Sequence, residues 1–304
     1  MARQPWRGCV KIDSLARRAS SGLAGRLLPA RMSSVHPSAT IATTARVARG
    51  ARIGPDVVIG EYAIIETDVV VGARCRIDSH AVVKRWTALG TDNQISSGAV
   101  LGSDPLDKAF QGDRSYLRIG SGNSIREHFT ISRGTEPESE TVIGDGNFIM
   151  TSGHIAHNCR IGNETVIASA TLVAGHVQIE DRAFVSGGIG VQQHLRIGEL
   201  SMVGGMTRVN QDVTPYLTHV GPTMAVHGLN LVGLRRAGLG SIEISRVRRA
   251  YRILFRSGMP LEEALTKVEL EVVGPHARHM VEFIRASKRG VCRRKGRGKE
   301  KQED

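Results

Sequence analysis

The segment GHIAHNCRIG, residues 153–162, places His154 and His157 three positions apart among small and aliphatic residues. A neutral imidazole titrates near neutral pH, so it can take a proton from a hydroxyl group, and it is also a common metal ligand. The pair alone does not choose between catalysis, metal binding and an ordinary solvated surface. That choice depends on what the fold brings beside the two rings.

An aliphatic residue recurs at every sixth position through most of the chain. In the series from Val35 to Val209, 27 of the 30 positions hold Ile, Leu or Val, and a small residue often stands four positions later. The exceptions are Asp107, Asp113 and Pro137. Such a hexapeptide repeat is typical of a parallel β-helix, in which three hexads, each a short strand and a corner, close a coil of 18 residues. We therefore expect an all-β solenoid of about ten coils.

The composition agrees with a solenoid. Aromatic residues make up only 4% of the chain, so aliphatic side chains must fill its core. Glycine often follows the aliphatic residue, as in IGPDVV and IGNETV, and we expect it at corners that require a positive φ. We also expect the coils to wind left-handed. This rests only on resemblance to the hexapeptide-repeat class, because connections between parallel strands are usually right-handed.

The pattern divides the chain into a repeat region and a helical region. Residues 32–218 carry the repeat, with a polar insert loop at 102–118 and a smaller excursion around Pro137. Loops that leave a rigid solenoid often carry binding residues. Residues 219–290 change to helical spacing, and we expect them to form an α-helical C-terminal domain that covers the open end of the solenoid.

The net charge of +12 is concentrated at the two ends of the chain. Residues 1–31 hold seven Lys and Arg and residues 285–304 hold nine, whereas residues 32–284 carry 25 basic and 25 acidic residues. The body has no excess of positive charge, so we expect no nucleic-acid partner. We expect residues 291–304 to be a basic disordered tail.

The first 31 residues and the cysteines bear on the compartment. Residues 1–31 read as a disordered leader, either sequence ahead of a true start at Met32 or a mitochondrial or plastid presequence. The four cysteines lie far apart without a C-x-x-C pair, which indicates a reducing compartment without a disulfide framework. No apolar run is long enough to span a membrane. We expect a cytoplasmic protein, or an organellar one if the presequence is genuine.

Residues 18 apart stack on successive coils, roughly 4.8 Å apart. Two such columns carry polar groups: His157, Gly175 and Gln193 in one, and Asn158, His176 and His194 in the other. One interpretation is a solvated ladder of polar side chains. A second is a zinc site formed by His154, His157 and His176, although no nearby carboxylate is evident to orient the ligands.

The third interpretation is general-base catalysis, and we favour it. A neutral His157 takes a hydroxyl proton, while Gly175 offers its backbone N–H to a developing oxyanion. This chemistry needs neither a metal nor another cofactor, so we expect none.

Five segments together resemble one family of acyltransferases. They are GHIAHNCRIGN, TLVAGHVQIED, MVGGMTRVNQDVTPY, GLNLVGLRRAG and RAYRILFRSG. They are similar to the UDP-N-acetylglucosamine acyltransferases, which open lipid A biosynthesis, and the similarity covers about residues 35–290. A bare hexapeptide repeat is shared by many acetyltransferases, but the H-x-A-H motif followed by A-G-H and G-L-R-R is specific.

The resemblance implies a role for each matching residue. His157 is the general base that deprotonates the glucosamine 3-hydroxyl, and Gly175 holds the oxyanion. The substrate contacts would come from His154, His176, Gln193, Asp107, Asn230 and Arg236. Acyl-chain length would depend on Met202 and Gly205.

The resemblance also implies partners. The donor is a 3-hydroxyacyl chain on acyl carrier protein, the acceptor is UDP-N-acetylglucosamine, and the enzyme is a homotrimer with its sites at subunit clefts. Because carrier proteins are acidic, a basic docking surface is expected on the helical domain. Its candidates are Arg235, Arg236, Arg246, Arg248, Arg249 and Arg252.

Several positions depart from the family pattern. Asn158 stands where the family usually has aspartate, and asparagine would stabilise an imidazolium less. Leu106, Gln192, His194 and Ala237 also differ. A divergent acyltransferase for another amino-sugar nucleotide therefore stays open, as does a non-catalytic solenoid scaffold.

Overall fold

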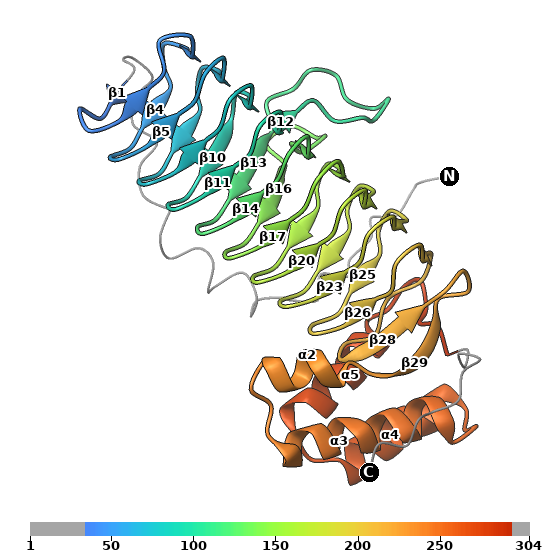
Figure 1. Ribbon diagram of the computed structural model, residues 1–304. Helices are drawn as coiled ribbons and strands as arrows, with labels where there is room; N and C mark the ends of the chain where they lie inside the picture. Colours follow the sequence, from blue (N-terminus) through green and yellow to red (C-terminus); the bar gives the residue numbers. More distant parts are fainter. Residues whose placement is uncertain (1–33, 294–304) are drawn as a thin grey trace, which may run out of the picture. The chain divides into compact units, whose positions relative to one another are not determined.

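The computed structural model describes residues 34–293, which lie within one compact unit. These residues form a left-handed parallel β-helix followed by a small helical region (Figure 1). Each of the three walls of the prism is a parallel sheet built from every third strand, with nine strands in sheets A and C and eleven in sheet B. The expected fold class is confirmed.

Most strands are only two residues long. Sheet A contains β1 (Ser34–Val35), β4 (Arg52–Ile53), β7 (Val70–Val71), β10 (Thr87–Leu89), β13 (Tyr116–Ile119), β16 (Glu140–Ile143), β19 (Arg160–Ile161), β22 (Gln178–Ile179) and β25 (Arg196–Ile197). Sheet C contains β3 (Arg46–Val47), β6 (Ile64–Ile65), β9 (Val82–Val83), β12 (Val100–Ser103), β15 (Thr130–Ser132), β18 (His154–Ile155), β21 (Leu172–Val173), β24 (Gly190–Val191) and β27 (Arg208–Val209).

Sheet B extends beyond the repeat into an antiparallel hairpin. It contains β2 (Thr40–Ile41), β5 (Val58–Ile59), β8 (Arg76–Ile77), β11 (Gln94–Ile95), β14 (Ser124–Ile125), β17 (Phe148–Ile149), β20 (Val166–Ile167), β23 (Phe184–Val185), β26 (Met202–Val203), β28 (Leu217–Val220) and β29 (Ala225–Leu229). The second residue of a typical repeat strand, such as Ile155 or Ile167, points inward and is fully buried. The period of six thus builds a continuous aliphatic core.

Strands on successive coils pair with an offset of 18 residues, as in His154 with Leu172. The offset rises to 30 where Gln94 pairs with Ser124 and to 24 where Thr130 pairs with His154. The extra residues leave the prism as two excursions, residues 104–115 and residues 133–139. The insert expected at 102–118 is therefore shorter, because its first and last residues extend β12 and β13.

The expected reason for the corner glycines is wrong. Positive φ falls at non-glycine residues spaced six apart, such as Asp56, Tyr62 and Asp68. The glycines that follow the aliphatic residues serve close stacking instead. A Cβ on Gly72 would lie 2.4 Å from the carbonyl oxygen of Gly90 on the next coil, so glycine is needed there for space.

The region after the repeat begins with strands rather than helices. Residues 217–229, mostly expected to be helical, form the β28–β29 hairpin around Gly221, which has a φ of 84°. The helices begin only at residue 231. They are α2 (Leu231–Arg236), α3 (Ser241–Tyr251), the π-helix η1 (Arg252–Arg256), α4 (Leu261–Glu271) and α5 (Pro275–Arg285). They form a second core with the last coils, and the hairpin joins that core to sheet B.

The expectations for residues 1–31 and for most of residues 291–304 concern parts of the chain outside the described range. Within residues 34–293, no helix combines the length and the apolar character needed to cross a membrane.

Candidate active site

The candidate site lies at the corner between sheets C and A, which we call the C–A corner. His157 lies here between β18 and β19, and Gly175 occupies the same place on the next coil, between β21 and β22. The imidazole lies directly against this glycine. A Cβ on Gly175 would be 2.6 Å from both Cε1 and Nε2 of His157, so only glycine admits the ring in this position.

Hydrogen bonds fix the tautomer of His157, which is only 7% exposed. Its Nδ1 lies 2.9 Å from Oδ1 of Asn158, and the backbone N–H of Thr135 donates to the same oxygen at 3.0 Å. A carbonyl oxygen only accepts, so His157 Nδ1 carries the proton. The lone pair is therefore on Nε2, which is the atom that a general base uses.

Asp107 faces His157 from the first excursion. One of its carboxylate oxygens lies 3.4 Å from His157 Nε2, and the other accepts from the backbone N–H of Ala109 at 2.9 Å. The carboxylate is placed to pair with the imidazole when the ring is protonated. A substrate hydroxyl that reaches Nε2 has to enter between these two groups.

A buried arginine anchors this excursion, and no pattern in the sequence indicated it. Arg133 is 1% exposed, forms an ion pair with Asp104 and donates to the carbonyl of Gly102. Its guanidinium also lies 5.0 Å from the ring centre of Trp86 and 5.2 Å from that of Phe110. The second excursion thus holds the first over the C–A corner.

Two further histidines surround His157. The ring of His176 lies 5.2 Å from that of His157 and 4.6 Å from that of His194. Burial lowers the pKa of His176, and the neighbouring histidines lower it further. His154, on β18, faces Thr130 through Nδ1 at 2.7 Å, and burial lowers its pKa too. His154 Nε2 is buried without a partner among the described residues.

The other predicted residues lie elsewhere. Gln193 is exposed one coil beyond Gly175. Met202 lies on the outer face of sheet B, and Gly205 lies at the corner between sheets B and C.

The structure does not bring Asn230 and Arg236 to the His157 corner within one chain. Asn230 caps α2 by accepting from the Gly233 N–H, and it donates to the carbonyl of Leu200 at the corner between sheets A and B. Arg236 is exposed at the end of α2.

The surroundings argue against the zinc interpretation. Within residues 34–293, no group of three or more His, Cys, Asp or Glu side chains is arranged to hold a metal ion. The Nδ1 atoms of His154 and His157 already face Thr130 and Asn158. The arrangement suits proton transfer by His157. Among the described residues, no backbone acceptor pairs with the Gly175 N–H, which leaves it free to donate.

A parallel β-helix with such a corner defines the class of hexapeptide-repeat transferases. Comparison with protein families agrees. Residues 50–85 match the family described as bacterial transferase hexapeptide (six repeats), and residues 212–292 match the family described as Udp N-acetylglucosamine O-acyltransferase, domain 2.

Individual relatives identify the family. The chain is 41% identical over 268 residues to an acyl-[acyl-carrier-protein]–UDP-N-acetylglucosamine O-acyltransferase from Verminephrobacter eiseniae, covering 86% of this chain and all of that protein. It is 42% identical to the protein of the same name from Gloeothece citriformis, covering 68% and 75% of the two chains. The chain belongs to the UDP-N-acetylglucosamine O-acyltransferase family, and it is an acyltransferase.

A solved structure agrees. The UDP-N-acetylglucosamine acyltransferase from Arabidopsis superposes with a TM-score of 0.73 at 36% identity, covering 85% of this chain and 99% of that one. The comparisons give no support to the alternative of an organellar presequence in residues 1–31.

Proposed function

We propose that this enzyme transfers a 3-hydroxyacyl chain from acyl carrier protein to the 3-hydroxyl of UDP-N-acetylglucosamine, the first step of lipid A biosynthesis. The names of its relatives support the two substrates. The observation that carries the assignment of His157 as general base is its locked tautomer, with a bare Nε2 beside the Gly175 backbone.

The reaction follows from this geometry. Nε2 of His157 takes the proton of the 3-hydroxyl as the oxygen attacks the thioester carbonyl. The Gly175 N–H donates to the oxyanion that forms. The carbon–sulfur bond then breaks, and the carrier thiolate leaves with the proton that His157 returns. Asp107 stabilises the imidazolium during this exchange because its carboxylate faces Nε2.

Other residues would bind the substrates. His154 has a free Nε2 beside His157, and we assign it, with His176 and Gln193, to the sugar nucleotide. We assign Asn230 and Arg236 to the phosphate-bearing ligands, reached through a neighbouring subunit or the cap. Met202 and Gly205 would limit the acyl chain, and a glycine at 205 leaves room for a longer one, because its added Cβ would meet no atom closer than 3.5 Å.

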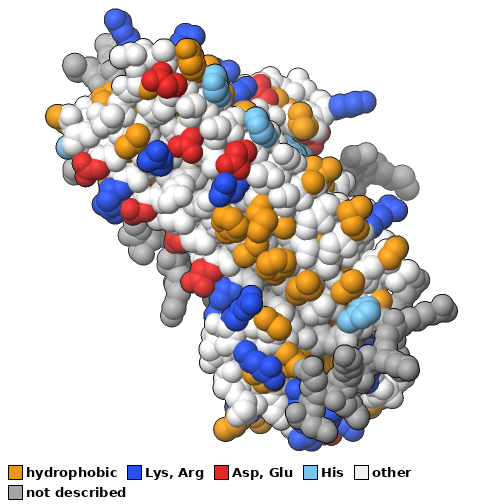
Figure 2. All heavy atoms as spheres, viewed as in Figure 1, with side chains coloured by type: hydrophobic (Ala, Val, Ile, Leu, Met, Phe, Trp, Pro, Cys, Tyr) orange, Lys and Arg blue, Asp and Glu red, His pale blue; other side chains and the backbone are white. Residues whose placement is uncertain are grey.

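We also propose a homotrimer. Apolar side chains gather over β17 to β26 on the outer face of sheet B (Figure 2). Phe148 and Phe184 belong to this column and are 38% and 37% exposed, which favours burial against another chain.

The carrier protein would dock on the cap. Two of the arginines expected there already have acidic partners, since Arg246 pairs with Glu243 and Arg249 with Glu271. The docking surface therefore rests on the remaining exposed arginines of that set, which are Arg235, Arg236, Arg248 and Arg252.

The test is the His157→Ala variant, assayed with 3-hydroxyacyl carrier protein and UDP-N-acetylglucosamine. We expect kcat to fall by a factor of about 100 to 10,000, with circular dichroism and oligomer size unchanged. The matched control is His36→Ala, an exposed histidine on the first coil. Retained activity in His157→Ala would refute the base assignment.

The same assay separates the alternatives. Amino-sugar nucleotides are offered beside UDP-N-acetylglucosamine, over a series of acyl chain lengths. Faster transfer to an amino group would favour the divergent acyltransferase, and absence of both binding and transfer would favour the scaffold.

A further inference from the structure

The second excursion brings a carboxylate to the partner of the catalytic histidine. Asn158 accepts from His157 Nδ1–H through Oδ1 and donates through Nδ2 to Oε2 of Glu136 at 2.9 Å. The orientation of this amide is fixed, because the Thr135 N–H donates to Oδ1 and the carboxylate accepts from Nδ2. The three side chains thus form a continuous hydrogen-bonded chain that starts at the imidazole and ends at a negative charge.

We propose that Glu136 is a positioning residue for the acyl transfer, acting through the Asn158 amide to hold His157 and to stabilise its imidazolium. The inference rests on the proposed function. An asparagine beside a general base is neutral, so alone it offers the imidazolium only a dipole. Hydrogen bonds in a chain polarise one another, and a carboxylate on Nδ2 makes Oδ1 a stronger acceptor. Glu136 therefore supplies indirectly the charge that an aspartate in place of Asn158 would supply by contact.

The surroundings of Glu136 keep it ionised. Partial burial alone would raise its pKa, but hydrogen bonds from its own backbone N–H, from Asn158 and from Ser139 outweigh that effect and lower it. The neighbouring His176 acts in the same direction. Asn158 is itself held by its backbone N–H, which donates to the buried Thr141 hydroxyl at 2.8 Å.

Other charged groups also face His157 and must be separated from this effect. Asp107 lies against Nε2 from the first excursion, His176 lies on the next coil, and His154 lies on the same strand. The hydrogen-bonded chain through Nδ1 includes none of these groups, so substitutions at Glu136 and Asn158 isolate it.

The experiment compares kcat, KM and the pH profile of Glu136→Gln, Asn158→Asp and the double variant. We expect Glu136→Gln to lower kcat about five- to tenfold with KM changed less than twofold, and to move the acidic limb of the kcat profile to lower pH. In the Asn158→Asp background the same change should be neutral or should raise kcat, because the introduced carboxylate would already face the imidazole and Glu136 would only repel it.

The matched control is Glu138→Gln on the same excursion. Glu138 pairs with Arg114 at 2.7 Å and with the Tyr116 hydroxyl, not with Asn158. It should leave the pH profile unchanged. A wild-type kcat and profile in Glu136→Gln would overturn the proposal, as would an equal loss in both backgrounds, which would mean that Glu136 merely holds the excursion.

A second readout does not depend on activity. The Nδ1 proton of His157 is observable by NMR, and Glu136→Gln should move its resonance upfield because the hydrogen bond weakens. An unchanged resonance counts against the relay. Activity that survives His157→Ala would instead overturn the proposed base, so the two failures are distinguishable.

Discussion

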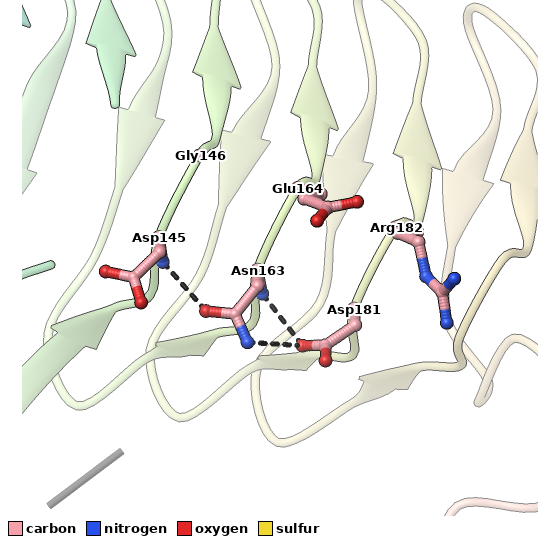
Figure 3. A pocket seen from close by; sticks show the side chains of 6 residues that line it. All are labelled: Asp145, Gly146, Asn163, Glu164, Asp181 and Arg182. Atoms are coloured by element: carbon pink, nitrogen blue, oxygen red, sulfur yellow. Dashed lines mark hydrogen bonds between the residues drawn. The ribbon is translucent and has the colours of Figure 1, made fainter. Parts of the chain in front are cut away.

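The prism has a second corner built like the candidate site, and its chemistry is different. The A–B corner links sheets A and B and carries Asp145, Asn163 and Asp181 in one column (Figure 3). The Asp145 N–H donates to Asn163 Oδ1, and the Asn163 N–H donates to Asp181 Oδ1, both at 2.8 Å. Each side chain in this ladder pairs with the coil beside it, and solvent reaches all of them.

The C–A corner has the same backbone turn but another environment. Two excursions cover it, a buried arginine holds them, and its imidazole is almost fully buried. The contrast shows that the repeat supplies positions at regular heights, whereas the insertions decide which position becomes a site. At its far end the A–B corner receives the cap instead. There His279 of α5 pairs with Glu180 at 3.2 Å, and Tyr216 donates to Glu199 at 3.1 Å.

The largest effect should come from Gly175→Ala. The added Cβ would lie 2.6 Å from Cε1 and Nε2 of His157, so the ring has to move from its position. We expect kcat to fall at least about 100-fold while the solenoid stays folded, because a small misplacement of a reacting group costs that much. The control is Gly240→Ala, whose added methyl group meets nothing within 4 Å. Wild-type kcat in Gly175→Ala would remove the basis of the comparison.

A smaller, pH-dependent effect is expected at the cap. Burial alone would lower the pKa of His279, but the hydrogen bond and charge of Glu180, with the charges of Glu199 and Glu282, raise it above the ordinary value. A raised native pKa stabilises fully below the unfolded pKa, about 6.5, and the stabilisation is lost as pH rises through the native value. His279→Gln should therefore lower Tm most at pH 6 and progressively less toward pH 9.

The C–A corner should respond in the opposite sense. The pKa values of His154 and His176 are lowered, so protonation of these rings as pH falls below about 6.5 favours the unfolded chain. A Tm difference between wild type and His279→Gln that does not change with pH would contradict the cap assignment. Tm profiles of both proteins over this range provide the measurement.

The smallest effect is expected for Asp181→Ala in the A–B ladder. The substitution removes the acceptor of the Asn163 N–H, but water replaces it at this open corner. We expect a loss of about 0.5–1 kcal/mol in unfolding free energy and no change in kcat. Thermal unfolding and the acyl-transfer assay test both points. A large fall in kcat would mean that the ladder also takes part in catalysis.

The sequence predicted those features that depend on the repeat. The period of six placed the inward aliphatic residues, and the step of 18 placed His157 against Gly175. It did not predict Arg133 or Glu136, because both lie in an excursion where the periodicity stops and no rule of spacing relates loop residues to the coils. Sequence offered one weak signal there, since charged residues cluster around Pro137 in RGTEPESE.

Two errors have physical explanations. Glycine was assigned to positive φ, but the turn places that conformation on the next-but-one residue, and the glycine serves contact between coils. The β28–β29 hairpin was missed because it follows the last regular hexad and its strands alternate over only a few residues. Asn230 was assigned from the family resemblance alone, and its capping bond to Gly233 was not foreseen.

The fixed spacing between coils also limits how this gene can change length. Loss of one codon between those for His157 and Gly175 would rotate every later residue out of line with the catalytic wall, since His154 and Leu172 pair only at a separation of 18. Codons gained or lost in the segment for residues 104–115 would leave that alignment untouched. Natural variants with insertions or deletions should therefore be confined to the two loops and the chain ends, and the stretch between the two excursions and the cap should vary only by substitution.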